Sequence, residues 1–243
     1  MPRFFKENFS NDPILSEDDS AHIVRSLRMK NGESLTVCDL AGKDYLCKII
    51  SADPKAVKLE IINSLPTQSE PKVNVTLFTG LLKGDKNEQV LRHAVELGIT
   101  EFVPVLFNNC VSRPDLKSAN AKIKRWQKIA NEAAGQSGRG ILPRVKRISS
   151  FSDLCTALKD FDLVLFFYEA GGIPLSEAVT QKSKAARNIA VITGPEGGFT
   201  PDEAKLLAEH GAKTITLGRR ILRAETAPLA ALTGVMLLTD NLE

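Results

Sequence analysis

The sequence lacks the features of a membrane-spanning or exported protein. No apolar run approaches the roughly 20 residues that a transmembrane helix needs. The first seven residues, MPRFFKE, contain no long apolar stretch and no cleavage site of small residues, so they do not resemble a signal peptide. We therefore expect a cytoplasmic protein.

Metal-binding and disulfide patterns are also missing. The four cysteines, Cys38, Cys47, Cys110 and Cys155, form no CxxC pair, and the three histidines form no HExxH arrangement. We expect four reduced, mostly buried thiols and no metal site. The phosphate-binding patterns GxGxxG and GxxxxGK[ST] are absent as well, which argues against simple dinucleotide or triphosphate binding.

Charge is unevenly distributed, although the net charge is only +3. Residues 113–147 hold ten Lys and Arg residues but only two acidic ones. A basic segment in a nearly neutral chain is typical of a nucleic-acid partner. The alternative is a solvated helix face with no ligand.

The two parts of the chain follow different patterns. Residues 1–70 contain short alternating runs between turn signals, which predict a small β-barrel or sandwich. A helix is expected over 16–27 with Ser16 as its N-cap, and the polar segment 66–71 is expected to be a linker. The runs that predict strands are 33–38, 43–50 and 56–62.

From residue 73 onward, apolar strands alternate with amphipathic helices. This alternation predicts a parallel sheet covered on both faces. The expected strands are 73–78, 101–107, 163–167, 188–193 and 213–217. The expected helices are 85–97, 121–134, 152–158 and 201–210.

The most informative segment is TGPEGGFTPDE, residues 193–203. Thr200, Pro201 and Glu203 form a capping box with proline at the first helical position. The preceding glycines, Gly194, Gly197 and Gly198, permit unusual backbone angles and let a ligand approach the main chain. The alternative is a tight turn with no ligand.

A second loop, LGRRILRAETA at residues 217–227, also follows an apolar run. Loops of adjacent strand–helix units lie together at the carboxyl edge of a parallel sheet, where such folds bind ligands. Thr226 is a candidate N-cap for the helix that follows. Residues 229–238 are apolar nearly all round, which predicts a helix buried on both sides, in a homodimer interface or within one subunit.

In these two loops the chain resembles the RsmE family, the 16S ribosomal RNA uridine-N3 methyltransferases of the SPOUT superfamily. The strongest matches are GPEGGF at 194–199 and LGRRILRAETA at 217–227. Weaker matches are PRFF at 2–5, HIVRSLR at 22–28, ELGI at 96–99, and the segment from Arg125 to Arg139. The resemblance extends over nearly the whole chain.

The resemblance implies an α/β protein with an N-terminal PUA-like β-barrel that binds RNA, residues 1–70. It also implies a C-terminal SPOUT methyltransferase domain with a trefoil knot, residues 73–243, and a homodimer. The implied cofactor is S-adenosyl-L-methionine, with no metal. Its expected contacts are Thr193, Gly194, Pro195, Glu196, Gly197, Gly198, Leu217, Gly218, Ile221, Leu222, Arg223, Thr226 and Ala227.

The implied reaction is methylation of N3 of a uridine in the decoding region of 16S rRNA, within the small ribosomal subunit. It requires removal of the N3 proton, for which Glu196 and Glu225 are candidate acceptors. Both have structural alternatives: Glu196 bonding loop amides, and Glu225 pairing with Arg223. Arg3 or Arg223 is the candidate cation that would ease proton loss.

The residues expected to contact RNA are Arg3, Arg25, Arg28, Arg113, Lys122, Arg125 and Arg139. The family usually has an arginine and a serine after the second strand of the sheet, where this chain has Asn109 and Cys110. If the family arginine contacts RNA, we expect its role in this chain to be displaced or to be shared with Arg113. Rival functions are a SPOUT enzyme acting on a ribose 2′-hydroxyl or a guanine, a non-catalytic RNA-binding protein, and a nucleotide-dependent enzyme of another α/β fold.

Overall fold

The computed structural model describes residues 1–180 and 185–242, and its internal contacts divide the chain into two compact units. One unit contains Met1–Glu70 and Ala134–Leu142, and the other contains Pro71–Ala133 and Pro143–Glu243. The domain ranges expected from the sequence, 1–70 and 73–243, stay a prediction. The contacts differ from them in one respect, because residues 134–142 pack with the N-terminal unit.

The N-terminal unit is built on a four-stranded sheet. Its strands, in spatial order, are β1 (Arg3–Phe5), β2 (Ser34–Cys38), β3 (Lys43–Ser51) and β4 (Lys58–Pro66). β1 runs parallel to β2, and the other pairs are antiparallel. The alternating residues of these strands bury one face, so the three strands expected from the sequence are confirmed. The short β1 was not expected, since three residues carry too little pattern.

A helical segment closes the core of this sheet. Ser16 Oγ accepts a hydrogen bond from the Asp19 amide at 3.2 Å, which confirms the predicted N-cap. The helix begins as α1 (Glu17–Ala21) and continues as the π-helical turn η2 (His22–Ser26). Ile23, on this turn, and Phe9, in the 3₁₀ turn η1 (Phe9–Asn11), are fully buried against the sheet.

The second segment of this unit, residues 134–142, is held by a buried ion pair. Arg139 is 2% exposed, and its Nε and Nη2 donate to the Glu70 carboxylate at 3.0 and 2.8 Å. The Gly140 amide also donates to Glu70, and Cys38 Sγ donates to the Gly140 carbonyl at 3.2 Å. The pair therefore fixes two chain segments that are far apart in sequence.

The C-terminal unit contains an eight-stranded sheet in which every strand pair is parallel. The spatial order is β10-β12-β9-β11-β5-β6-β7, and β8 also pairs with β6. The strands are β5 (Asn74–Gly80), β6 (Glu101–Leu106), β7 (Arg144–Val145), β8 (Ser149–Ser150), β9 (Leu163–Phe167), β10 (Ile173–Pro174), β11 (Asn188–Thr193) and β12 (Lys213–Thr216). The predicted parallel sheet is confirmed, with its five long strands near their expected bounds.

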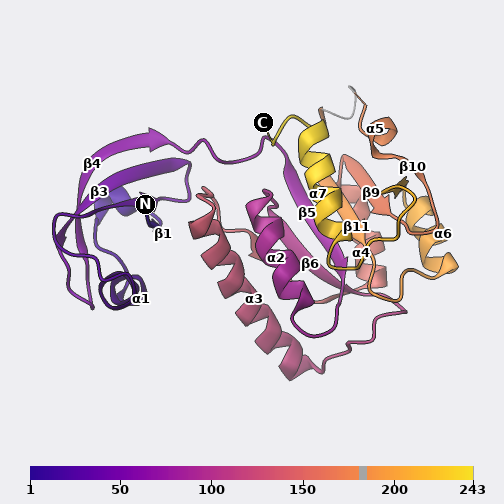
Figure 1. The fold of residues 1–243 in the computed structure, drawn as a ribbon, viewed down its shortest axis with the longest axis horizontal. Helices are drawn as coiled ribbons and strands as arrows, with labels where there is room; N and C mark the ends of the chain where they lie inside the picture. The colour runs from indigo at the N-terminus through magenta and orange to yellow at the C-terminus, as the bar shows by residue number, and fades with distance from the viewer. Residues whose placement is uncertain (181–184, 243) are drawn as a thin grey trace. The chain divides into compact units, whose positions relative to one another are not determined.

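Helices cover both faces of this sheet (Figure 1). Right-handed crossovers place α2 and α3 on one face and α4 and α6 on the other. The ring of Phe107 contacts Phe151 at the start of α4 and Phe199 just before α6. These contacts bring α4 and α6 together. The helices are α2 (Lys86–Glu96), α3 (Leu116–Gln136), α4 (Phe151–Ala157), with the 3₁₀ turn η3 (Leu158–Asp160), α5 (Leu175–Ala178), α6 (Pro201–Glu209) and α7 (Ala227–Leu238).

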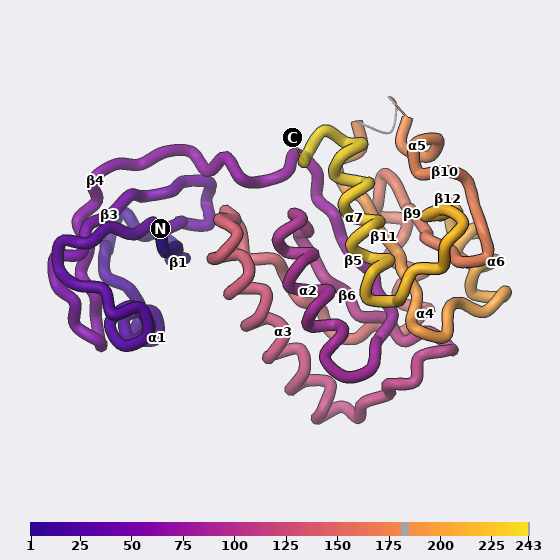
Figure 2. Tube along the Cα trace, in the orientation of Figure 1, coloured from indigo at the N-terminus to yellow at the C-terminus, as the bar shows by residue number. Residues whose placement is uncertain are grey.

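The C-terminal helix α7 packs against α2 and β11. Beyond it, the chain ends beside the segment that enters β5, where the Lys72 amide donates to Asn241 Oδ1 at 2.6 Å (Figure 2). In the described part of the chain no helix is both long and apolar enough to cross a membrane.

In the single chain α7 is buried on one side only, so burial of its other side in a homodimer stays a prediction. Ala231, Leu232, Val235 and Met236 are buried, whereas Leu237 is 48% exposed in the single chain. The expected side-chain cap at Thr226 is wrong, since this residue has helical backbone angles and makes no capping hydrogen bond.

The carboxyl edge of the sheet is tightly packed around Gly80, the last residue of β5. A β-carbon there would lie 2.7 Å from Pro195 Cα and 2.8 Å from the Gly194 carbonyl carbon. Real β-carbons do not approach other atoms so closely, and both neighbours are main-chain atoms of the loop after β11. Gly80 is therefore required by space.

We predict that Gly80→Ala lowers the free energy of unfolding by roughly 1–3 kcal/mol, as overpacking typically does. Thermal unfolding measures the effect. The control is Gly135→Ala in α3, where the added β-carbon would meet its nearest atom at 3.4 Å. Alanine there favours the helix, so the control should unfold at the wild-type temperature or above it. Equal melting of the two variants would contradict the steric argument.

Candidate functional site

A pocket lies at the carboxyl edge of the C-terminal sheet, as expected for a parallel α/β fold. Its volume is about 540 Å³, within the range of small-molecule and cofactor sites. The loops after β9, β11 and β12 form most of it, and the first turn of α2 adds Lys86. Strands far apart in sequence thus converge on one cavity.

The loop after β11 is fixed at both of its ends. At its far end, Thr200 and Glu203 form the predicted capping box of α6. Glu203 is only 2% exposed, and its carboxylate accepts from the Thr200 amide at 2.9 Å and from the Asn108 amide at 2.8 Å. This carboxylate therefore ties the start of α6 to the end of β6.

The three glycines of this loop are required for different structural reasons. Gly198 has φ +66°, the left-handed region that favours glycine. Gly194 and Gly197 have no such angle, but a β-carbon would meet the Phe199 ring at 2.7 Å and Asn109 Cβ at 2.8 Å, respectively. The expectation of unusual backbone angles is thus confirmed for one glycine, and the other two are required by close packing.

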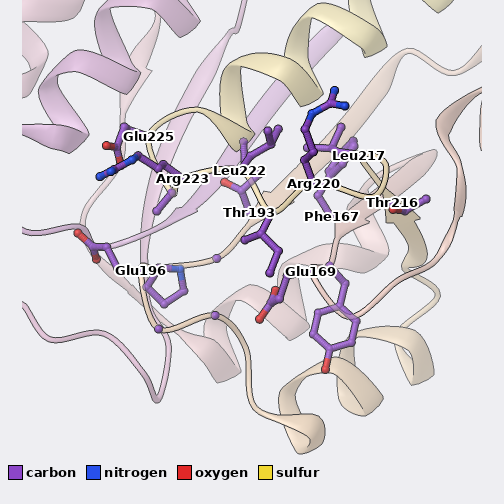
Figure 3. Close-up of a pocket in the computed structure, with 18 of the residues that line it drawn as sticks. Phe167, Glu169, Thr193, Glu196, Thr216, Leu217, Arg220, Leu222, Arg223 and Glu225 are labelled. Atoms are coloured by element: carbon purple, nitrogen blue, oxygen red, sulfur yellow. The ribbon is translucent and has the colours of Figure 1, made fainter.

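Charged side chains gather at one side of the pocket, where Figure 3 shows Glu196, Arg223 and Glu225. Lys86 Nζ lies 3.2 Å from Glu225 Oε2 and 3.5 Å from Glu196 Oε1. Glu196 Oε1 also accepts from the Lys83 amide at 3.0 Å. One ammonium group therefore links two loops to the start of α2.

These contacts shift the pKa values in opposite directions. The hydrogen bond to Glu225 is the largest effect that raises the pKa of Lys86. Backbone hydrogen bonding, followed by Lys86 and Arg223, lowers the pKa of Glu225. Burial raises the pKa of Glu196, but hydrogen bonds from main-chain amides and the charge of Lys86 outweigh it and lower the pKa. All three groups are therefore ionised at neutral pH.

On the other side of the pocket, Phe167 and Leu217 lie opposite this charged group, together with Arg220 and Glu169 (Figure 3). Thr193 lines the pocket, and its buried Oγ1 has no hydrogen-bond partner among the described residues. Such an atom normally has a partner, so it fits a site that receives a polar ligand. The pocket thus suits a molecule with both an apolar ring and polar groups.

Known proteins match both units. The family described as RNA methyltransferase domain matches residues 69–236, and the family described as RNA methyltransferase PUA domain matches residues 15–62. Ribosomal RNA small subunit methyltransferase E of Bacillus subtilis is 34% identical, with 100% of this chain and 98% of that protein covered. The enzyme of the same name from Mesomycoplasma hyopneumoniae is 33% identical, with 96% and 98% covered.

The chain belongs to the ribosomal RNA small subunit methyltransferase E family. Among solved structures, the family member from Neisseria gonorrhoeae, bound to S-adenosyl methionine, superimposes with a TM-score of 0.86. It is 31% identical, and 98% of each chain is covered. The predicted family, RNA methyltransferase class and PUA-containing α/β fold are thereby confirmed, while the trefoil knot stays a prediction.

The family's loop residues are where the sequence analysis expected the cofactor. All thirteen expected cofactor contacts line the pocket except Thr226. Their role in binding stays a prediction. The sequence analysis missed other lining residues, which lie at or after the ends of the strands β5, β9 and β12. Their position at the ends of predicted strands was the available signal. These residues are Lys86, Phe167, Tyr168, Glu169, Thr216, Arg219, Arg220 and Ala224.

Three of the four candidate catalytic residues line the pocket, namely Glu196, Arg223 and Glu225. Arg3 lies in the N-terminal unit, where its two terminal nitrogens bind the Asp44 carboxylate. Its side chain is 9% exposed. This ion pair gives Arg3 a structural role in its own sheet, and its expected catalytic and RNA contacts stay predictions.

The residues expected to contact RNA differ in their surroundings. Arg25 and Arg28 are exposed on the N-terminal unit. Arg113 donates to the carbonyls of Phe107 and Asn108 at 3.1 and 2.9 Å, so it caps the end of β6. Nearby, Asn109 Nδ2, at the family departure, donates to the Gly197 carbonyl at 3.0 Å and so supports the pocket loop.

On α3, Lys122 is half-buried beside the Trp126 ring, whereas the side chain of Arg125 is 69% exposed and pairs with Glu88 at 2.7 Å. Arg139 is buried on Glu70, which disfavours its expected RNA contact.

We predict that Arg139→Met and Arg125→Met separate stability from RNA binding. Removing one partner of a buried ion pair leaves the other charge unpaired, so Arg139→Met should cost roughly 3 kcal/mol. Arg125→Met removes an exposed pair and should cost less than about 1 kcal/mol. Thermal unfolding and RNA affinity are measured for both variants. An Arg139→Met protein of wild-type stability that binds RNA weakly would instead support the RNA contact.

Proposed function

We propose that this protein transfers a methyl group from S-adenosyl-L-methionine to N3 of a uridine in 16S rRNA of the small ribosomal subunit. The observation that carries the proposal is that its pocket consists of the two loops by which the chain matches the family. Full-length similarity to enzymes named ribosomal RNA small subunit methyltransferase E supports the substrate.

The pocket fits the cofactor on its own chemistry. The apolar side chains of Phe167 and Leu217 suit an adenine ring, and the unpartnered Thr193 hydroxyl suits a polar group of the ligand. Main-chain amides and carbonyls of the glycine loop, residues 194–198, would hold the remaining polar atoms. When bound, the cofactor supplies an activated methyl group on a sulfonium.

The protein's part in the reaction is alignment and removal of a proton. Positioning the uracil for in-line attack supplies much of the rate. As N3 forms its bond to the methyl carbon, the carbon–sulfur bond breaks with its electron pair staying on sulfur, and the N3 proton leaves to a carboxylate. Glu225 is the preferred candidate acceptor, because its Oε2 has no hydrogen-bond partner among the described residues, whereas Glu196 Oε1 accepts from the Lys83 amide.

Lowered pKa values make both carboxylates weak bases, so each accepts a hydrogen bond more readily than a full proton. Either residue could also relay the proton to water. The target uridine must leave its stack to reach the pocket. Exposed basic residues of α3 and of the N-terminal unit would hold the neighbouring phosphates.

The same protein is proposed to act as a homodimer. In the single chain, the apolar helix α7 leaves Leu237 48% exposed, and Ile221 on the pocket loop is 85% exposed. Large exposed apolar side chains are typical of a subunit interface. A second copy seated on α7 would cover Leu237.

The decisive test is methyl transfer from labelled S-adenosylmethionine to small subunits from cells that lack this enzyme. Nucleoside analysis should find 3-methyluridine. We also expect Glu225→Gln to lower kcat about 100-fold, because it removes a charged acceptor from the reacting base. Asp202→Asn, a change on the exposed first turn of α6, should retain wild-type kcat.

Each other outcome excludes part of the proposal. A different methylated nucleoside would support the cofactor assignment but exclude uracil N3 as the methylated atom. The protein would then be a ribose or guanine methyltransferase. RNA binding without cofactor binding in a calorimetric titration would indicate a non-catalytic RNA-binding protein.

The dimer has its own prediction. Leu237→Glu places a charge where the second copy would bury an apolar side chain, so it should convert a dimer to monomers in light scattering. Leu206→Glu, on α6, changes a side chain of similar exposure, 40%, and should leave the oligomeric state unchanged. A wild-type monomer at micromolar concentration would exclude the dimer.

A further inference from the structure

Within the described part of the chain, Lys86 forms ion pairs with both candidate catalytic carboxylates of the pocket. It was not found from the sequence, and its ammonium group reaches Glu225 and Glu196 at 3.2 and 3.5 Å. It begins α2 directly after the loop that follows β5, so the end of that strand fixes its position. A positively charged group held at a fixed position in a ligand pocket is a candidate for a role in binding or catalysis.

We propose that Lys86 and Glu225 together read the edge of the target base, with Lys86 donating to O4 of uracil and Glu225 accepting from N3–H. This inference rests on the proposed function and adds the residues that select uracil. Lys86 is assigned to substrate recognition and to stabilising the charge that forms on O4 when N3 loses its proton.

The hydrogen-bonding pattern of the pair matches uracil. Its O4 accepts and the adjacent N3–H donates. An ammonium group is a donor only, and an ionised carboxylate is an acceptor only. Cytosine has the reverse pattern, with an amino group at position 4 and an accepting N3, so it would place donor against donor and acceptor against acceptor. The pair therefore attracts uracil and repels cytosine.

The geometry leaves room for this contact. Lys86 Nζ forms two ion pairs, at 3.2 and 3.5 Å, and an ammonium group has three N–H donors, so at least one donor remains for a ligand. The side chains of Lys86 and Glu225 are 31% and 24% exposed, and both line the cavity. Their mutual contact places a donor and an acceptor side by side, as O4 and N3 are in uracil.

The electrostatics fix the direction of each hydrogen bond. The ion pair raises the pKa of Lys86, and backbone hydrogen bonding together with Lys86 lowers the pKa of Glu225. Neither group changes its charge near neutral pH, so the donor stays a donor and the acceptor stays an acceptor. Glu196, held by the Lys83 amide, anchors the ammonium from the other side.

A competing role for Lys86 is to bind the carboxylate of the cofactor's amino-acid group. That role would require Lys86 for cofactor affinity and would make it indifferent to the target base. The two assignments therefore differ in two measurable quantities, the Kd for S-adenosylmethionine and the discrimination between uracil and cytosine.

The test uses the full chain with Lys86→Met, Lys86→Arg and the control Lys205→Met, which removes an equal charge from a side chain that is 75% exposed on α6. Calorimetry measures the Kd for S-adenosylmethionine. Steady-state methyl transfer gives kcat on small subunits. Competition by subunits reconstituted with cytidine in place of the methylated uridine gives the base discrimination, and thermal unfolding verifies that each variant is folded.

We expect Lys86→Met to lower kcat about 100-fold, as loss of one preorganised donor to a developing charge does. Its Kd for the cofactor should stay within about threefold of wild type, and the cytidine substrate should compete as well as the uridine one. Wild type and Lys205→Met should prefer uridine by about tenfold or more. Lys86→Arg keeps a donor and should retain part of the discrimination and of kcat.

Full discrimination in Lys86→Met would overturn the inference, and a large rise in its cofactor Kd would assign Lys86 to the cofactor instead. These outcomes differ from failure of the proposed function, which would appear as wild-type protein that forms no 3-methyluridine. If Lys86→Met unfolds, Lys86→Arg decides, because a substitution that keeps the charge but preserves neither discrimination nor kcat contradicts a donor role.

Discussion

The shape of the pocket depends on the hydrogen bonds that the buried carboxylate of Glu203 accepts. This carboxylate accepts hydrogen bonds from the first residue of the α6 capping box and from the amide of Asn108, at the end of β6. A carboxyl group that is 2% exposed is stable only when its oxygens have such partners. Because the pocket loop lies between β11 and this anchor, its glycines and Glu196 have fixed positions. The close contact of Gly80 with the Gly194–Pro195 main chain restrains the loop from the opposite side.

Parallel topology explains how a small pocket gathers charges from distant parts of the chain. The carboxyl ends of β5, β9, β11 and β12 lie at one edge, so Lys86, Glu169, Glu196 and Glu225 line the same cavity although up to 139 residues separate them. Glu196, Arg223 and Glu225 lie on one side of the cavity, whereas Phe167 and Leu217 lie on the other side with Glu169 and Arg220. The pocket therefore offers both apolar and charged surfaces to a ligand.

Basic residues in this chain have two distinct uses, which composition does not separate. Arg139 and Arg3 are buried in bidentate ion pairs with Glu70 and Asp44, where a planar guanidinium satisfies a carboxylate within the N-terminal unit. Arg25 and Arg28 are exposed and remain available to phosphates, whereas Arg125 is exposed but paired with Glu88. A count of positive charge over 113–147 thus overstates the RNA-binding surface, because some of that charge stabilises the fold.

The sequence by itself determined the two-part organisation, the parallel sheet, the helix start at Thr200 and the two ligand loops, because periodicity, capping and glycine-rich turns are local properties. It also determined the family, since both loop motifs are contiguous. Tertiary structure alone decided that residues 134–142 pack with the N-terminal unit, that Arg139 is buried, that Thr226 makes no cap, and that Lys86 meets Glu196 and Glu225. Apart from the missing cap at Thr226, those features depend on contacts between segments that are far apart along the chain. No local pattern predicts such contacts, so only the folded chain could bring these segments together.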